Sequence, residues 1–477
     1  MGTVGVRQSE GDDKASAAAV EELRALVGDQ LVMAGDAEYE AVRRVWNGMI
    51  DRRPALIVRC RGVVDVVAAV SFARMHGLPL AVRGGGHNVA GFGTCDGGVI
   101  VDLSPMRSVR VDVAARTARA GGGATWGDLD RETQLFGLAA PGGIVSTTGI
   151  GGLTLGGGQG WLRRTYGMAC DSLLSADVVT ANGDVVVAGE SENADLLWAL
   201  RGGGGNFGVV TSLEYRVHPV GPSIAFAGPT YPAESAPAVL AGLRRLAADA
   251  PDELNISATW WTIPPAPDFP EELHGRAVLT IGVLYVGPPD SGEELLRPFK
   301  ELDQPLLDLS ATMPYTALQQ MFDPFFPAGE LHYYWKSIYL AGLDDDVVRA
   351  IADHLAARPS PLSMTGLWAL GGALARVDAT ATATGARDAP FLLEILANWA
   401  DPGESAANIA WARDFFAAVE PFSSGKTNFN FPGFGDEPGF VEAALADNWE
   451  RLLEVKRKYD PTNLFRLNQN IPPDGAP

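Results

Sequence analysis

Two glycine-rich stretches decide the fold class of this sequence: RGGGHN at residues 83–88 and PGGIVSTTGIGGLTLGGGQG at residues 141–160. A third, RGGGGNFG, follows at residues 201–208. Because glycine has no side chain, backbone N–H groups in such runs approach a phosphate or a planar ligand closely. We therefore expect three backbone-dominated loops, with residues 141–160 entirely in loop, that together hold a phosphate-bearing or large planar ligand.

Two common nucleotide-binding motifs do not fit these loops. A dinucleotide-binding Rossmann turn needs a strand, a glycine-rich turn and then a helix, whereas His87 is followed by VAGFGTCDGGVIVDL, which indicates a loop and a strand. The sequence SGKT at residues 424–427 imitates the end of a Walker loop, but Glu420 stands where its first glycine should be. The histidines show no i, i+4 pairing, so we expect no metal site.

Composition excludes several classes of partner. The 477 residues include 37 Lys and Arg against 58 Asp and Glu, a net charge of −21, which repels phosphate backbones and anionic lipid surfaces. No apolar run is long enough for a membrane helix, and three cysteines do not make a disulfide framework. We expect a small-molecule substrate, no nucleic-acid or membrane partner and a cytoplasmic location; the oligomeric state stays open.

Taken in order with Ala169-Cys170-Asp171 and the closing stretch YDPTNLFRLNQNIPP (459–473), the glycine-rich motifs resemble those of berberine-bridge-enzyme-like FAD-linked oxidases, of the vanillyl-alcohol-oxidase flavoprotein superfamily. The resemblance implies an α+β fold with a PCMH-type FAD-binding domain of two α/β subdomains and an antiparallel substrate-binding sheet covered by helices. We expect the FAD domain over residues 1–218 (core about 50–218), the substrate domain over 219–425, and a tail over 426–477 that returns to the FAD domain.

The resemblance also implies how FAD is held. His87 is similar to the histidine that bonds the flavin 8α carbon, and Cys170 to the cysteine that bonds flavin C6, so we expect FAD attached covalently at two points. The other residues expected to contact the cofactor are Arg83, Gly84, Gly85, Gly86, Asn88, Gly91, Pro141, Gly142, Thr148, Gly149, Gly151, Gly152, Gly156, Gly157, Gly158, Gly160, Tyr166, Gly167, Asn206, Phe207, Gly208, Val210, Asn468 and Asn470.

Oxidation of an alcohol by hydride transfer needs a base within hydrogen-bond reach of the substrate hydroxyl. The Tyr-x-Asn-Tyr stretch that supplies this base in related sugar and alcohol oxidases is replaced here by Asn428-Phe429-Asn430-Phe431. Glu394, within the apolar run FLLEILANW (391–399), is the expected replacement, because burial beside Leu392 and Leu396 would raise its pKa. A water-facing glutamate on an edge strand is the alternative.

Other residues of the predicted substrate domain are candidates for the same cavity. Tyr334, Lys336 and Tyr339, in HYYWKSIYL (332–340), are expected to line it, the first two with catalytic roles. Leu173, three residues after the predicted cysteine anchor, would border the position where dioxygen reacts and could block it.

The expected function is that of an FAD-dependent oxidoreductase that oxidises a sugar or secondary-metabolite alcohol and passes electrons to O2. Because of Leu173, a dehydrogenase with another acceptor is the close alternative. Oxidation of a C–N or C–C bond in natural-product biosynthesis, an enzyme with non-covalent cofactor and a non-catalytic flavin-binding protein also stay open.

Overall fold

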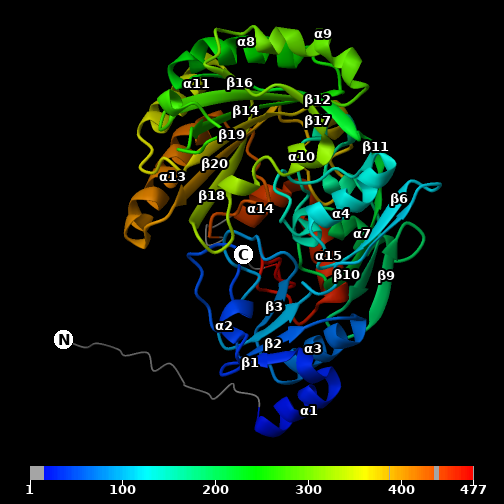
Figure 1. The fold of residues 1–477 in the computed structure, drawn as a ribbon. Coiled ribbons are helices and arrows are strands. Elements are labelled where there is room, and N and C mark those ends of the chain that lie inside the picture. The colour runs from blue at the N-terminus through cyan, green and yellow to red at the C-terminus, as the bar shows by residue number, and fades with distance from the viewer. Residues whose placement is uncertain (1–15, 386, 435–439, 476–477) are drawn as a thin grey trace.

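The computed structural model describes residues 16–385, 387–434 and 440–475. Figure 1 shows two halves, which we call modules. The N-terminal module holds the blue, cyan and blue-green elements together with the C-terminal helices, and the central module is a large sheet under a layer of helices. The last strand of the N-terminal module's second large sheet ends at Arg216, and the central sheet begins at Ser223. Between them, His218–Pro219 pairs with Leu138–Ala139 in a separate two-stranded sheet.

The first sheet of the N-terminal module has four strands in the order β1-β2-β4-β3, of which β2, β4 and β3 run parallel. Helices α1 and α3 pack their apolar side chains against it, so the strands are almost fully buried. The bounds are β1 Leu31–Met33, β2 Leu56–Arg59, β3 Leu80–Arg83, β4 Val99–Asp102, α1 Ala17–Val27, α2 Tyr39–Val42 and α3 Val63–Met75.

The second sheet of this module is antiparallel, with the strand order β5-β6-β10-β8-β9. The helices that accompany it include the two C-terminal ones, whose buried leucines pack in the same core as α7. The bounds are β5 Val109–Asp112, β6 Thr117–Gly121, β7 Leu138–Ala139, β8 Leu173–Val179, β9 Val185–Gly189, β10 Val209–Arg216, β11 His218–Pro219, α4 Trp126–Thr133, α5 Ile150–Leu155, α6 Arg163–Tyr166, α7 Ala194–Leu200, α14 Phe440–Leu445 and α15 Trp449–Tyr459.

Helix α5 corrects the sequence analysis, which placed all of residues 141–160 in loop. Its local helix propensity is weak because two of its six residues are glycine. Tertiary contacts stabilise it instead. Ile150 is fully buried, and the Thr154 hydroxyl lies 2.8 Å from the hydroxyl of Tyr215 on β10.

The central module is built on an antiparallel sheet in the order β16-β13-β15-β14-β19-β20-β18, with β12 and β17 attached through β15. Helices α8, α9, α11 and α13 cover its outer face (Figure 1). The bounds are β12 Ser223–Ala227, β13 Pro229–Pro232, β14 Leu254–Thr262, β15 Ala277–Tyr285, β16 Leu307–Asp308, β17 Ala311–Pro314, β18 His332–Leu340, β19 Met364–Ala369, β20 Phe391–Trp399, α8 Ala236–Ala248, α9 Pro289–Lys300, α10 Tyr315–Gln319, α11 Asp345–Ala356, α12 Gly372–Arg376 and α13 Ser405–Val419. The predicted α+β class with a helix-covered antiparallel sheet is confirmed.

Side chains of the central sheet alternate between its two faces, as the period of two requires. On β20, Leu393 and Ile395 pack in the core under the helices, whereas Leu392 and Leu396 belong to the clusters on the opposite face. This inner face is turned toward the N-terminal module. The long strands β18, β19 and β20 of the central sheet are therefore buried on both faces, whereas the edge strands β16 and β17 keep exposed residues.

The C-terminal tail is fixed to the N-terminal module by a buried cation. The Lys456 ammonium, with no exposed surface, is 2.7 Å from a carboxylate oxygen of Asp460 and donates to the backbone carbonyls of Asn206 and Phe465. Breaking such a pair is costly, because the remaining partner would be left as an uncompensated buried charge. The ion pair places residues 465–469 beside the third glycine-rich loop.

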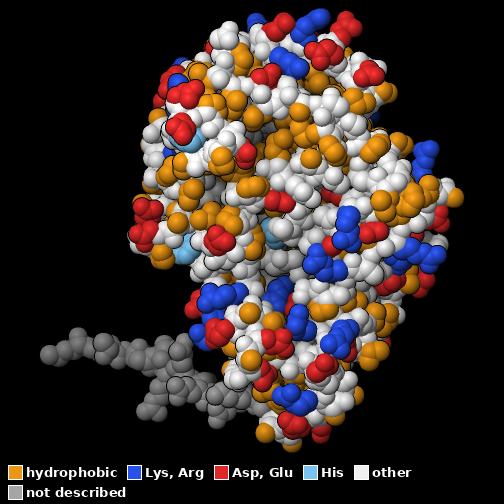
Figure 2. All heavy atoms as spheres, in the orientation of Figure 1, with side chains coloured by type: hydrophobic (Ala, Val, Ile, Leu, Met, Phe, Trp, Pro, Cys, Tyr) orange, Lys and Arg blue, Asp and Glu red, His pale blue; other side chains and the backbone are white. Residues whose placement is uncertain are grey.

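On the face shown in Figure 2, acidic and basic side chains are interspersed over both modules. Within the described part of the chain, no helix combines the length and apolar character needed to cross a membrane.

Candidate active site

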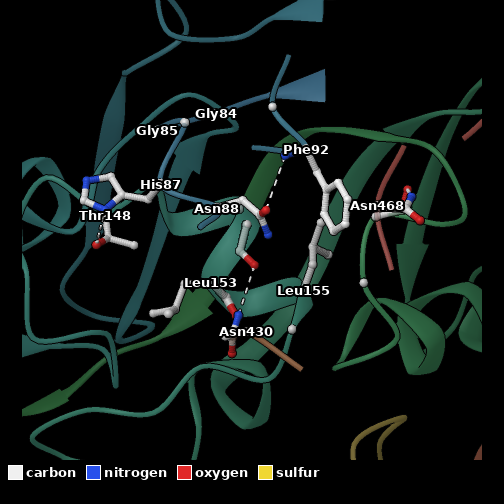
Figure 3. Close-up of a pocket in the computed structure, with 18 of the residues that line it drawn as sticks. Gly84, Gly85, His87, Asn88, Phe92, Thr148, Leu153, Leu155, Asn430 and Asn468 are labelled. Carbon is white, nitrogen blue, oxygen red and sulfur yellow. Dashed lines mark hydrogen bonds between the residues drawn. The ribbon is translucent and has the colours of Figure 1, made fainter. Parts of the chain in front are cut away.

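A cavity of about 270 Å³ lies between the two modules. Its floor comes from the glycine-rich loops, its roof from the inner face of the central sheet, and one wall from residues 429–431 and 465–469. In Figure 3, His87 and Thr148 lie together on one side and Asn468 on the other, so segments far apart in the sequence meet around this space.

About half of the residues predicted to contact the cofactor line this cavity. Beside His87, these are Arg83, Gly84, Gly85, Gly86, Asn88, Thr148, Gly149, Gly151, Gly152, Gly156, Gly208, Val210 and Asn468. The predicted residues that are not part of its lining are Gly91, Pro141, Gly142, Gly157, Gly158, Gly160, Tyr166, Gly167, Cys170, Asn206, Phe207 and Asn470.

Several of the predicted residues outside the lining stabilise the packing of the loops instead. Gly157 and Gly158 have positive φ angles, and their carbonyls accept the backbone N–H groups of Cys170 and Ala169. Asn206 donates to the backbone carbonyl of Gln469 and accepts from the N–H of Ile471, both at 3.0 Å, so it anchors the tail.

The glycines that line the cavity leave bare backbone on its floor. A Cβ atom added at Gly152 would meet nothing within 4 Å, and one at Gly205 would meet only the side-chain amide of Asn468 at 3.9 Å. By contrast, a Cβ at Gly85 would collide with the backbone of Gly149, so these two glycines let the first and second loops pack together. Open backbone beside the cavity is what a large flat cofactor needs for direct contact, so the residues present fit FAD.

His87 lies in the cavity wall with both ring nitrogens near hydroxyls. Its Nε2 is 2.9 Å from Thr147 Oγ1, its Nδ1 is 3.4 Å from Thr148 Oγ1, and its ring stacks on Trp46 at a centroid distance of 4.7 Å. Burial lowers the pKa of His87 to about 3. The imidazole is therefore neutral at physiological pH, which leaves one nitrogen lone pair available for bonding.

Cys170, the second predicted anchor, lies outside the cavity. It has no exposed surface and packs in an apolar cluster with Trp161, Leu162 and Phe226. Its Sγ donates a weak hydrogen bond to Asp171 at 3.7 Å, and burial raises the pKa of the thiol. A buried protonated thiol is unreactive, so the structure does not place Cys170 where it could bond the cofactor.

The carboxyl group of Glu394 enters the cavity from the inner face of β20, on the side of Leu392 and Leu396 as the sequence analysis expected. It is not the water-facing edge residue of the alternative interpretation, because β20 lies between β18 and β19 and the side chain is buried. Its Oε2 accepts a hydrogen bond from Trp368 Nε1 at 2.8 Å. Burial raises the pKa of Glu394 to about 7, which suits a base at neutral pH.

Behind Glu394, Trp368 is held by a buried arginine. The Arg163 guanidinium lies over the Trp368 ring, 4.6 Å from its centroid, and donates to the backbone carbonyls of Ala369 and Gly160. Burial lowers the pKa of Arg163 to about 9. Its positive charge still favours the carboxylate form of Glu394 and opposes part of the effect of burial.

Tyr334, Lys336 and Tyr339 are not part of the cavity lining, so the expectation that they line it is wrong. The Tyr334 hydroxyl accepts from Arg413 Nε at 3.1 Å, and the Lys336 ammonium lies 3.9 Å from the centroid of the Phe416 ring; both partners belong to α13 on the outer face. Trp335, between them on β18, faces the cavity instead. The period of two in a strand could have identified this alternation.

Most of the roof around Glu394 is apolar, with Phe326, Trp335, Trp368 and Leu396 among its residues. The segment at residues 428–431, which stands where related oxidases have Tyr-x-Asn-Tyr, also lines the cavity through Phe429, Asn430 and Phe431. Gln159 adds a polar group whose amide donates to the Tyr339 hydroxyl at 2.7 Å. The aromatic residues from the central module were missed, because which of them meet the loops depends on how the two modules pack.

Leu173, predicted to border the site of dioxygen reaction, lies elsewhere. It begins β8, has no exposed surface and packs in the core of the N-terminal module with Leu213 and Tyr215. It does not belong to the cavity lining. Leu173 therefore gives no reason to expect blocked access to the cavity.

Two family models match the chain: the FAD binding domain over residues 54–189, and the berberine and berberine-like domain over residues 428–472. The (R)-6-hydroxynicotine oxidase of Paenarthrobacter nicotinovorans is 33% identical over 462 residues, 94% of this chain and 97% of its own length. An FAD-linked oxidoreductase of Dictyostelium discoideum is 32% identical over 447 residues, 92% of this chain and 93% of its own.

Solved structures agree with these sequence matches. The crystal structure of 6-hydroxy-D-nicotine oxidase from Arthrobacter nicotinovorans matches with a TM-score of 0.81 at 30% identity, covering 93% of this chain and 97% of that one. The fold is also shared with Physcomitrella patens BBE-like 1, at a TM-score of 0.85, 24% identity, and coverage of 95% and 99%. The chain therefore belongs to the berberine-bridge-enzyme-like family of FAD-dependent oxidoreductases with a PCMH-type fold.

Proposed function

We propose that this protein oxidises a small aromatic molecule that carries a hydroxyl or amine group, with FAD bound over the glycine-rich floor and Glu394 as the base. The observation that carries the proposal is the position of Glu394, a carboxyl group with a pKa of about 7 in a roof that is otherwise largely aromatic and aliphatic. When bound, FAD supplies the acceptor for the hydride.

The protein's own residues supply binding, orientation and removal of the proton. The aromatic side chains of Phe326, Trp335 and Phe431 offer flat apolar surfaces on which a planar substrate packs. The Glu394 carboxylate takes the proton from the substrate's hydroxyl or amine. Trp368 Nε1 donates a hydrogen bond to Glu394 Oε2 and so fixes the orientation of the carboxylate.

An aromatic substrate is favoured over a sugar because of the small number of polar groups in the roof. A site that binds a sugar must pair several hydroxyls, since each hydroxyl buried without a partner costs about 1–3 kcal/mol. The described residues that the central module contributes to the roof are Phe326, Trp335, Trp368, Glu394 and Leu396, and of these Glu394 alone is neither aromatic nor aliphatic. One relative with 33% identity is named a hydroxynicotine oxidase, which agrees with this choice.

We propose covalent attachment of FAD at His87 alone. This residue lies in the cavity with a neutral ring, whereas the thiol of Cys170 is buried among apolar side chains. We propose dioxygen as the electron acceptor, because Leu173, which favoured another acceptor, is buried away from the cavity. Rapid reoxidation of the substrate-reduced enzyme in air, followed by stopped-flow absorbance, is the expected result; slow reoxidation would point to a dehydrogenase.

The substrate assignment is tested by anaerobic bleaching of the flavin absorbance with benzylic alcohols, hydroxylated aromatic amines and aldohexoses. Aromatic compounds should bleach the wild-type enzyme, and Glu394→Gln should bind the same FAD but bleach far more slowly. Faster reduction by a sugar than by every aromatic compound would overturn the substrate class. An unchanged rate in Glu394→Gln would overturn the role of the base.

A further inference from the structure

Residues 44–49 form a bridge between the His87 loop and the central sheet. On one side, Trp46 N–H donates to the carbonyl of Gly86 at 3.1 Å, and Arg83 donates to the carbonyl of Arg44 at 3.2 Å. On the other side, Gly329 N–H donates to the carbonyl of Trp46 at 2.8 Å, and Gly48 N–H to that of Leu331 at 3.0 Å. This short segment, to which the sequence analysis gave no role, therefore touches both modules.

The side chain of Trp46 is clamped between the two modules. Its ring stacks on Tyr333 of β18, with centroids 3.8 Å apart and planes 14° apart, and on His87 at 4.7 Å and 18°. Its Nε1 donates to the carbonyl of Phe326 at 3.0 Å. With only 3% of its surface exposed, Trp46 has no freedom to change rotamer without displacing one of these contacts.

Asn47 fixes the same segment through its side-chain amide. Its Nδ2 donates to the carbonyls of Val89, in the His87 loop, and of Tyr333, at 2.7 and 2.9 Å. Its Oδ1 accepts the N–H of Tyr333 at 3.1 Å. Because Asn47 is fully buried and bonds to both modules, it holds the Trp46 backbone in register with β18 and with the loop.

The contacts of the His87 ring divide into two kinds. The hydroxyls of Thr147 and Thr148 meet its nitrogens at the ring edge, so they set the rotation of the ring within its plane. The tilt of that plane is set by the stacked Trp46 ring. The three residues before His87 are glycines, which offer no side chain to hold it.

We infer that Trp46 is a positioning residue for covalent attachment of FAD. Stacked between Tyr333 and His87, it holds the His87 imidazole in the plane that bond formation requires. The inference rests on the attachment at His87 proposed above. Attachment joins an imidazole nitrogen to the flavin 8α carbon. One N–H and one C–H bond break, and the two protons and two electrons released reduce dioxygen to hydrogen peroxide. The central module thus takes part in loading the cofactor as well as in binding the substrate.

The test compares Trp46→Leu and Trp46→Phe with Trp261→Leu. Trp261 is a matched control because it is a buried tryptophan of the same apolar cluster, on β14, that makes edge-to-face contacts with Phe269 and Phe325 and does not stack on His87. Each variant is purified and incubated with FAD in air. The flavin that stays on the denatured polypeptide after acid precipitation is then followed over time, together with total bound FAD and the melting temperature.

Trp46→Leu should attach FAD roughly 10-fold more slowly than wild type, the size of effect expected from losing an aromatic stack, while still binding FAD. Trp46→Phe should attach it at close to the wild-type rate, because the stack is kept. Trp261→Leu should lose stability yet attach FAD normally. Attachment at the wild-type rate in Trp46→Leu, or equal slowing in Trp261→Leu, would overturn the inference.

The outcome also separates this inference from the proposed function. If wild-type protein bleaches with an aromatic substrate but releases all its flavin on denaturation, the attachment and the role of Trp46 fail while the oxidation stands. If flavin is attached but no aromatic substrate bleaches it, the substrate proposal fails and the role of Trp46 is unaffected.

Discussion

The loop around His87 and the segment around Cys170 look alike in sequence but face different environments. Each follows a glycine-rich run, and each resembles a flavin anchor of the family. His87 lies in the cavity wall between an aromatic ring and two hydroxyls, whereas Cys170 lies in an apolar cluster and bonds its own neighbour Asp171. The comparison teaches that glycine runs mark where backbones pack closely, and that this packing occurs both beside a ligand and inside a core.

The largest expected effect is a complete difference between substitutions at His87 and at Cys170 in covalent attachment of FAD. His87→Ala should abolish covalent attachment of FAD, because it removes the nucleophilic nitrogen, whereas Cys170→Ala should leave attachment at the wild-type level. Acid precipitation followed by flavin fluorescence of the denatured polypeptide measures both. Loss of attachment in Cys170→Ala would show that the thiol reaches the cofactor and that the comparison is wrong.

The second prediction concerns Glu394, the carboxyl group in the roof of the cavity. Glu394→Gln should lower kcat by roughly 10²–10⁴-fold, the contribution of a positioned base. In the wild type, kcat/KM should rise with pH through about 7, where the Glu394 carboxyl of the free enzyme loses its proton. The variant should lack this rise. A decrease of less than 10-fold, or an unchanged pH profile, would show that a group other than Glu394 removes the substrate's proton.

Glu394 also predicts the pH dependence of stability. Its pKa is raised in the folded protein, so between the ordinary carboxyl pKa and about 7 the folded state keeps a proton that the unfolded state has released. The stability of the wild type should therefore fall as pH rises through this window, and Glu394→Gln should remove that part of the fall. Urea denaturation at pH 5 and pH 8 measures the difference, and an equal dependence in both proteins would contradict it.

A smaller effect is expected from crowding the carboxyl group. A methyl group at Gly366, beside Glu394 in the sheet, would lie 3.1 Å from Trp368 Nε1 and 3.2 Å from Glu394 Oε2. Gly366→Ala should therefore shift the carboxylate and lower kcat roughly 10-fold without loss of FAD. Gly282→Ala is the control, since its methyl group would meet Ser257 and Phe226 instead. Equal losses in the two variants would indicate a general effect on the sheet.

The smallest effect tests the core position of Cys170 directly. Cys170→Ala removes a fully buried sulfur atom and should destabilise the protein by about 1 kcal/mol, the cost of a small cavity. Denaturant unfolding of the flavin-loaded variant and wild type measures this difference. A variant as stable as the wild type would mean that the thiol is not packed as described.

The central sheet shows why part of the site could not be predicted. The pattern of β20 placed Glu394 on the face of Leu392 and Leu396, because side chains in a strand alternate. On β18 the same alternation separates Trp335, which faces the cavity, from Tyr334 and Lys336, which face α13. Even with the correct alternation, the sequence does not tell which of the two faces meets the glycine loops, since both faces of this sheet are buried.

The sequence by itself determined the family, the loops that form the cavity floor, the anchoring role expected of His87 and the choice of Glu394 as the candidate base. The family and the anchoring role expected of His87 come from the resemblance of its motifs, whereas the loops and Glu394 follow from local properties: glycine's conformational freedom and the alternation within one strand. Only the tertiary structure decided that Cys170 and Leu173 belong to cores, that Trp335 replaces Tyr334 in the roof, and that Trp46 bridges the modules. The direction of each of these side chains depends on what packs against it, and many of those partners, such as Phe226 for Cys170 and Tyr333 for Trp46, lie tens to hundreds of residues away in the chain.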